Sequence, residues 1–150
     1  AISLLSSCAC IRPGTQYSLM VFVIELTLDK TKKAPLPIGA YNQGIVTNGF
    51  VFTAGQVAID PATGNLIEGS FKDRVRQVMK NLNSILEEAG TNFSRVTKFT
   101  VFLTDMSNYA AVNKVFSEFI KEINAPARSL VAVFALPAGT DVEIECIATV

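Results

Sequence analysis

The segment from residue 127 to residue 136 constrains the fold of this chain more than any other, because it is apolar on both faces. Successive side chains of a strand point to opposite faces of its sheet. One face of this segment carries Leu130, Ala132, Phe134 and Leu136, and the other carries Val131, Val133 and Ala135. A strand with two apolar faces requires cover on both sides of its sheet. Other parts of the fold or another subunit must provide that cover.

Two segments have the periodicity of amphipathic helices and can cover one face. Apolar residues recur at spacings of three and four between residues 71 and 89. Ser70 and Asp73 resemble a capping box before this helix, and Gly90 is a C-terminal stop after it. A second helix is predicted to begin near Ser107 and to end at Asn124 and Pro126. Its apolar stripe consists of Tyr109, Val112, Phe116, Phe119, Ile120 and Ile123.

The remaining segments alternate or form short apolar runs, as strands do. Strands are predicted at 44–47, 50–56, near Leu66, 96–106, 127–136 and 141–150. The first two form a hairpin around Asn48 and Gly49. The order β-β-β-α-β-α-β-β predicts an α+β fold with a single mixed sheet. Right-handed crossovers place both helices on one face of that sheet. The other face is then open, and we predict that it packs against other subunits in an oligomer.

The first thirty residues differ in composition from the rest of the chain. Residues 1–24 contain no acidic residue, one arginine and four serines. This composition is typical either of an added arm or edge strand or of a targeting remnant, although transit peptides are usually richer in arginine. Pro35 and Pro37 follow a polar junction at 29–33. We therefore predict an N-terminal extension at 1–30 and a domain at 31–150.

The composition excludes several kinds of chemistry. The chain has no histidine, which excludes Ser-His-Asp and Cys-His sites and imidazole-ligated zinc. Thirteen basic and thirteen acidic residues cancel, so no net positive field attracts a nucleic acid. Three cysteines, Cys8, Cys10 and Cys146, do not form a disulfide framework and indicate a reducing compartment, cytoplasmic or mitochondrial. No apolar stretch is long enough to span a bilayer.

A few polar residues stand out against the apolar pattern. Arg128 lies at the start of the strand that is otherwise apolar, as a rim residue or as a bidentate clamp for a carboxylate or phosphate. Glu143 and Glu145 alternate with apolar residues, which favours a solvated face, although Glu143 approaches Arg128 if the last two strands pair antiparallel. Asn113 lies beside the stripe of the second helix, and Tyr41 lies in a loop. None of these residues alone specifies a reaction.

Together with their neighbours, these residues resemble the Rid/YjgF family of reactive-intermediate (imine/enamine) deaminases. The similar segments run in order from residue 31 to residue 150. They are Ala34-Pro35, Ile38-Gly39-Ala40-Tyr41-Asn42-Gln43, Phe52-Thr53-Ala54-Gly55-Gln56, Val112-Asn113, Pro126-Ala127-Arg128-Ser129, Ala135-Leu136-Pro137 and Val142-Glu143-Ile144-Glu145-Cys146-Ile147-Ala148. The Pro-Ala-Arg-Ser segment is the most specific of these.

The resemblance implies a chorismate-mutase-like fold assembled as a homotrimer, with active sites in the clefts between subunits. It implies hydrolysis of 2-imino and 2-enamino acids, such as 2-iminobutanoate and 2-iminopropanoate, to 2-keto acids and ammonia. In this scheme Arg128 holds the substrate carboxylate, and Glu143 or a backbone carbonyl orients the attacking water and takes its proton. Tyr41, Ala54, Gly55 and Asn113 complete the substrate site. The scheme needs no metal or organic cofactor and no nucleic-acid or membrane partner.

Two positions depart from the family pattern. Ala54 stands where serine is common, and Leu130 stands where cysteine is common two residues after the arginine. Both changes make the pocket more apolar and put the substrate preference in question. The alternative is a binding or regulatory role on the same trimer, including ribonuclease, translation-inhibitor or chaperone-like activity. The missing histidine and the neutral charge argue against efficient RNA cleavage.

Overall fold

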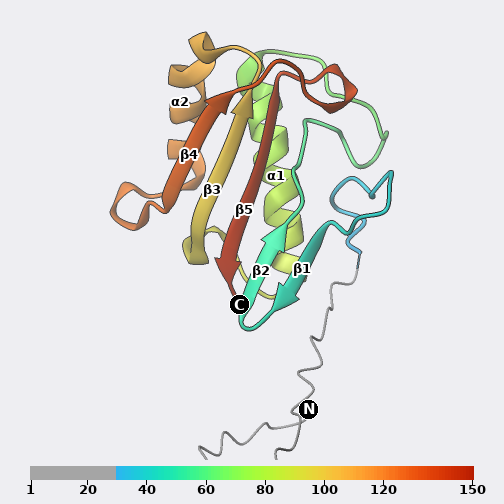
Figure 1. The fold of residues 1–150 in the computed structure, drawn as a ribbon, viewed down its shortest axis with the longest axis vertical. Coiled ribbons are helices and arrows are strands. Elements are labelled where there is room, and N and C mark those ends of the chain that lie inside the picture. Colours follow the sequence, from blue (N-terminus) through green and yellow to red (C-terminus); the bar gives the residue numbers. More distant parts are fainter. Residues whose placement is uncertain (1–29) are drawn as a thin grey trace, which may run out of the picture.

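A computed structural model describes residues 30–150 of the chain. Five strands and two α-helices form the domain (Figure 1), namely β1 Gly44–Thr47, β2 Phe50–Thr53, α1 Phe71–Glu88, β3 Val96–Leu103, α2 Tyr109–Phe119, β4 Ala127–Ala132 and β5 Val142–Thr149. Short 3-10 helices lie at Phe93–Arg95, Met106–Asn108, Glu122–Asn124 and Pro137–Gly139. The predicted N-terminal extension at 1–30 lies almost entirely outside the described residues.

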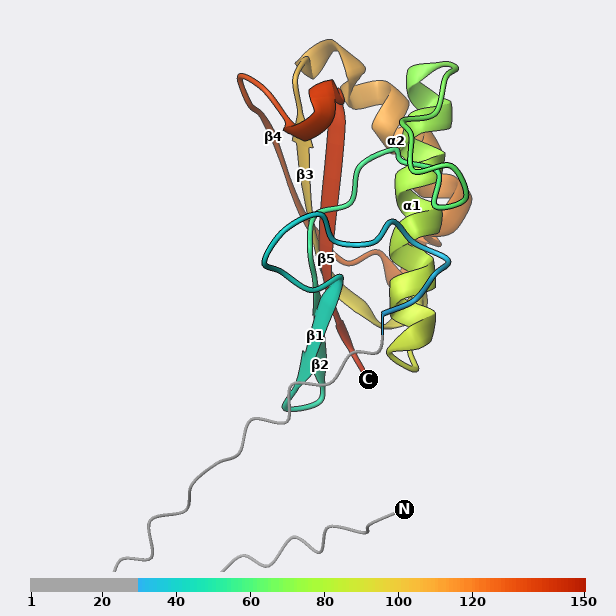
Figure 2. The ribbon, with the colours of Figure 1, turned by 90° about the vertical axis from the view of Figure 1, so that its right-hand side faces the viewer.

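The five strands form one mixed sheet in the order β1-β2-β5-β3-β4. The strands β3 and β4 are parallel, and all other neighbours are antiparallel. Both helices pack on the same face of this sheet, as predicted, and no helix of residues 30–150 covers the other face (Figure 2). The last two strands do not pair with each other, because β3 lies between β4 and β5 (Figure 1).

The core lies between the sheet and the helices, where the inward-facing side chains of the strands pack against the apolar faces of the helices. The buried side chains of β3 are Val96, Phe99, Val101 and Leu103, and those of β5 are Val142, Ile144, Cys146 and Ala148. The predicted capping box at the start of α1 is present, with Ser70 and Asp73 bonding each other's backbone N–H groups. The hairpin turn is also as predicted, since Asn48 and Gly49 both have positive φ.

Two predictions about the elements were wrong in detail. The strand expected near Leu66 consists of a single bridge to Ile59, because the turn from Asp60 to Asn65 closes on itself through backbone hydrogen bonds. The second helix is shorter than expected, because α2 stops at Phe119 and the chain continues through a separate 3-10 turn. Ile123, assigned to the apolar stripe, is 89% exposed.

The open face of the sheet carries large apolar side chains. Phe52 on β2 and Val131 on β4 are 42% and 45% exposed, and Phe50 is 39% exposed. Phe134, beyond the end of β4, is fully exposed. Residues 30–150 therefore leave the second face of β4 uncovered, as the sequence predicts. Among residues 30–150, no helix has the length and apolarity to cross a membrane.

Candidate active site

The predicted site residues fall into two separate groups. Arg128 and Asn113 line a pocket of about 780 Å³ beside α2 and β4, which we call the Arg128 pocket. Tyr41, Ala54, Gly55 and Glu143 line a second pocket of about 450 Å³, which we call the Glu143 pocket. Both volumes lie within the range of small-molecule sites. The structure brings together each group but does not join the two groups in one chain.

The sheet itself separates Arg128 from Glu143. Arg128 is in register with the buried Phe99, so its side chain lies on the helix-covered face. Glu143 is in register with Phe102 and alternates with buried neighbours on β5, so its side chain lies on the open face. The two residues also lie on strands that are separated by β3. One chain therefore cannot present both side chains to the same small molecule.

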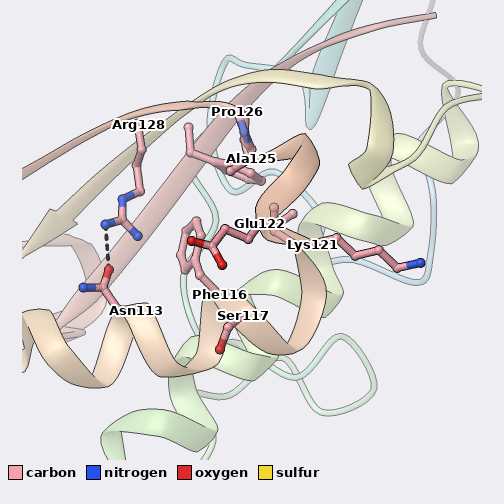
Figure 3. A pocket seen from close by; sticks show the side chains of 10 residues that line it. Asn113, Phe116, Ser117, Lys121, Glu122, Ala125, Pro126 and Arg128 are labelled. Carbon is pink, nitrogen blue, oxygen red and sulfur yellow. Dashed lines mark hydrogen bonds between the residues drawn. The ribbon is translucent and has the colours of Figure 1, made fainter.

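The Arg128 guanidinium is fixed by a polar contact from α2. Its Nη2 donates a hydrogen bond of 2.6 Å to Oδ1 of Asn113 (Figure 3). Among the side chains that the structure describes, no other forms a hydrogen bond or an ion pair with this guanidinium. A guanidinium carries five N–H donors in a planar fork that matches a carboxylate. The geometry therefore orients a cation and leaves donors for an anionic ligand.

Two aromatic rings of α2 support the same guanidinium. The Cζ atom of Arg128 lies 5.1 Å from the ring centroid of Phe116 and 5.8 Å from that of Tyr109. These distances are within the range of cation–π attraction. From the sequence, both residues are predicted only as members of an apolar stripe. The signal was nevertheless present, because Tyr109, Asn113 and Phe116 are spaced by four and three and share one helical face.

In the Glu143 pocket, a glycine backbone lies against the carboxylate. A Cβ atom added at Gly55 would overlap the Glu143 carboxylate. Gly55 follows the end of β2, and Gln56 next to it exchanges backbone hydrogen bonds with Ile144. These bonds hold the glycine beside β5. The residue type at position 55 is therefore dictated by the close approach of Glu143.

The Glu143 carboxyl group has a raised pKa. Partial burial is the larger cause, and the negative charge of Glu145 on the same face is the smaller one. A carboxylate with a raised pKa is a better proton acceptor than an ordinary one. Glu145, by contrast, does not line either pocket.

The other predicted residues surround Glu143. Tyr41 is 50% exposed and its ring packs over Gly39. Ala54 supplies a methyl group to the wall, and its backbone N–H donates to the carbonyl of Gln43. Much of the remaining wall is apolar and was not predicted, and it includes Leu36, Ile38, Val57, Ile59 and Pro137. Leu130, the other departure from the family pattern, packs against the core.

Cys146 does not contribute a reactive thiol to either pocket. It is buried, and burial raises the pKa of its thiol to about 12, so the thiolate is scarce at neutral pH. Within residues 30–150, no group of three or more Cys, Asp or Glu side chains is arranged to hold a metal ion. The chemistry that the described residues offer is therefore a fixed cation and a separate carboxylate of raised pKa.

The chain is similar to known proteins over the whole of the described domain. The model of the family described as Endoribonuclease L-PSP matches residues 31–150. A RutC family protein of Synechocystis is 48% identical over 126 residues, which is 83% of this chain and 97% of the relative. A rat protein named 2-iminobutanoate/2-iminopropanoate deaminase is 40% identical over 118 residues, which is 79% of this chain and 85% of the relative.

Solved structures share the fold as well. The crystal structure of Escherichia coli TdcF with bound serine superimposes with a TM-score of 0.77 at 37% identity. The match covers 83% of this chain and 98% of TdcF. This agreement extends the similarity from sequence to the arrangement of the sheet and its two helices.

Proposed function

This chain belongs to the Endoribonuclease L-PSP family, which is the Rid/YjgF family that the sequence resembles, and on that premise we propose that it is an imine deaminase. Its substrates are 2-imino and 2-enamino acids, including 2-iminobutanoate and 2-iminopropanoate. Its products are 2-keto acids and ammonia. The names of the rat, mouse and human relatives support this activity.

The observation that carries the proposal is the oriented guanidinium of Arg128. A 2-imino acid has a carboxylate next to its reactive carbon, and a planar guanidinium binds a carboxylate bidentately. Asn113 and the two rings of α2 hold the guanidinium before any ligand arrives. The serine bound to TdcF is itself a small amino acid with such a carboxylate.

Glu143 supplies the second part of the reaction in this proposal. A water oxygen forms a bond to C2 of the protonated imine while one water proton passes to Glu143, which gives a carbinolamine with a hydroxyl and an amino group on C2. Glu143 then returns this proton to the amino nitrogen, and the C–N bond breaks with release of ammonia. The hydroxyl proton is lost to water, which leaves the 2-keto acid. The protonated C=N is already electrophilic, so positioning provides most of the acceleration.

The complete site requires more than one copy of the chain. Arg128 and Glu143 lie on opposite faces of the sheet, and the open face exposes Phe50, Phe52 and Val131. We propose a homotrimer in which Arg128 of one subunit meets Glu143 of the next. Burial of the open face then also provides the cover that β4 lacks. Sedimentation or light scattering should give three chains per particle.

The test is a coupled assay with a threonine dehydratase that generates 2-iminobutanoate. We expect the protein to accelerate the release of ammonia and 2-ketobutyrate. Arg128→Ala should reduce this acceleration at least about a hundredfold, because two charge-assisted hydrogen bonds are lost. Arg95→Ala removes an exposed arginine outside both pockets and is the matched control. An Arg128→Ala trimer as active as the wild type would refute the proposal.

The assay must also address the ribonuclease named in the family description. The chain has no histidine for acid–base catalysis and a formal net charge of zero. We therefore expect no RNA cleavage after stringent purification. Cleavage that persists and is lost with Arg128→Ala would favour the RNA-directed alternative instead.

The predicted reducing compartment, cytoplasmic or mitochondrial, belongs to the same proposal and is tested by cell fractionation.

A further inference from the structure

Gln43 is a buried polar residue beside the Glu143 pocket to which the proposed reaction assigns no role. Its exposed fraction is 2%, although it lies next to a loop that is largely exposed. Its backbone carbonyl accepts a hydrogen bond of 2.9 Å from the N–H of Ala54. This bond attaches Gln43 to Ala54, which follows the end of β2 and precedes Gly55.

The side-chain amide of Gln43 reaches in the other direction, to the chain around residues 31–35. Its Oε1 accepts a hydrogen bond of 2.9 Å from the backbone N–H of Thr31. Its Nε2 donates to the carbonyl oxygens of Thr31, Ala34 and Pro35 at 3.0, 3.2 and 2.9 Å. All of these partners belong to the backbone, so the contacts depend on the amide of Gln43 and not on the side chains at 31–35.

These bonds close a loop. Residues 35 and 43 are the two ends, and the Gln43 amide joins them directly. We call residues 35–43 the Tyr41 loop. Within residues 30–150, the hydrogen bonds that residues 36–42 form are internal to the loop. The N–H of Tyr41 donates to the carbonyl of Gly39, and the N–H of Ile38 donates to the Tyr41 hydroxyl. A compact loop is held in place where its ends are joined, and we call this junction at Gln43 the neck of the loop.

The loop carries the outer wall of the Glu143 pocket. Leu36, Ile38 and Tyr41 line the pocket and are 57%, 90% and 50% exposed. Such exposed side chains have few contacts of their own to fix them. Their positions relative to Glu143 therefore depend on the neck. At the neck, Gln43 bonds both to Ala54 and to the backbone of residues 31–35.

We propose that Gln43 is a positioning residue: its buried amide closes the neck of the Tyr41 loop and so fixes Tyr41 relative to Glu143. This inference rests on the proposed deaminase function for its effect on rate. The structural part stands on the hydrogen bonds alone. The two parts are therefore tested by different measurements.

The structural part is tested by hydrogen exchange in the full chain. Gln43→Met keeps the length of the side chain and removes its hydrogen bonds. We expect the N–H groups of Thr31 and Ala54, which donate to the side-chain oxygen and to the backbone carbonyl of Gln43, to exchange about tenfold faster or more, because opening of the neck removes their protection. Thr91→Val is the matched control, since it removes a buried side-chain hydrogen bond to Thr149 outside both pockets. Unchanged exchange of the Thr31 and Ala54 amides in Gln43→Met would overturn the inference, whether or not the protein is a deaminase.

The effect on rate is tested by a double-mutant cycle. Gln43→Met should lower kcat/KM for 2-iminobutanoate hydrolysis about tenfold or more, whereas Thr91→Val should not. In a Tyr41→Leu background, Gln43→Met should have little further effect, because both changes act through the same loop. In an Asn113→Ala background the two effects should multiply. A purely structural role would give the same loss in both backgrounds and would overturn the inference.

A protein that folds poorly does not decide the test. Gln43→Asn retains the amide but is one methylene shorter, so it keeps part of the neck. We expect its exchange and kcat/KM to lie between those of the wild type and Gln43→Met. Wild-type values for both Gln43→Asn and Gln43→Met, with both proteins trimeric, would show that the amide has no positioning effect. If the wild type is inactive but the Thr31 and Ala54 amides exchange faster in Gln43→Met, only the deaminase proposal is refuted.

Discussion

The Arg128 pocket and the Glu143 pocket are built by different means. In the Arg128 pocket, side chains of one helix hold one side chain of the neighbouring strand, through a hydrogen bond and two aromatic rings. In the Glu143 pocket, the carboxylate rests against the backbone of Gly55 and beneath the Tyr41 loop. The first group is fixed by side-chain chemistry, and the second depends on how closely two segments of backbone approach.

This difference assigns separate tasks to the two regions. A preset guanidinium binds the charged end of a substrate, so changes around it should act mainly on KM. A carboxylate of raised pKa that orients water acts on the chemical step, so changes around it should act mainly on kcat. The assignment of tasks is therefore tested by whether a variant changes KM or kcat.

Among variants that keep both Arg128 and Glu143, the largest effect is expected from Gly55→Ala. The added methyl group overlaps the Glu143 carboxylate and must displace it. A displacement on the scale of an ångström should lower kcat about a hundredfold. The Ki of the product 2-ketobutyrate, which reports on binding at Arg128, should change little. A Gly55→Ala protein with normal kcat would show that the position of Glu143 does not matter to the reaction.

A smaller effect is expected from Asn113→Ala in the other region. The guanidinium loses its hydrogen-bond partner but keeps its charge and its aromatic contacts. Loss of one hydrogen bond to a charged group should raise KM about tenfold, with kcat largely retained. Asn83→Ala, which removes an amide from the exposed side of α1, provides the control. A fall in kcat with unchanged KM would contradict the assignment of tasks.

The smallest effect is expected on stability rather than rate. The pKa of Glu143 is raised in the folded chain above its ordinary value of 4.5. The folded state therefore binds the proton more tightly than the unfolded state, and folding stability falls as pH rises through the raised pKa. Glu143→Gln removes this penalty. Urea unfolding should show the variant to be slightly more stable than the wild type at neutral pH, with the advantage lost below about pH 4. A less stable variant at neutral pH would contradict the raised pKa.

The elements that local sequence rules determine were predicted well. The period of residues 71–89 and the pair Ser70 and Asp73 predicted α1 with its capping box. Asn48 and Gly49 predicted the hairpin turn, because both positions require positive φ. The strand near Leu66 failed because its alternation extends over too few residues to distinguish a bridge from a strand.

The arrangement of the site could not be predicted from local rules. The resemblance named Arg128, Asn113, Tyr41 and Glu143, but the sequence alone does not place β3 between β4 and β5. That placement separates the two residues by one strand, and the registers of β4 and β5 on β3 put Arg128 and Glu143 on opposite faces. The need for glycine at position 55 is also a property of the fold, since its neighbour Glu143 is distant in the sequence.

The central claim is that each active site takes Arg128 from one subunit and Glu143 from another, and mixed trimers test it most directly. Arg128→Ala and Glu143→Gln should each be inactive alone. When equal amounts are co-expressed, random assembly should restore about a quarter of the sites, because each site needs one intact residue from each of two neighbouring chains. Recovery of activity near that fraction is the predicted result. Mixed trimers that are confirmed to form, yet remain as inactive as the two variants alone, would contradict the account.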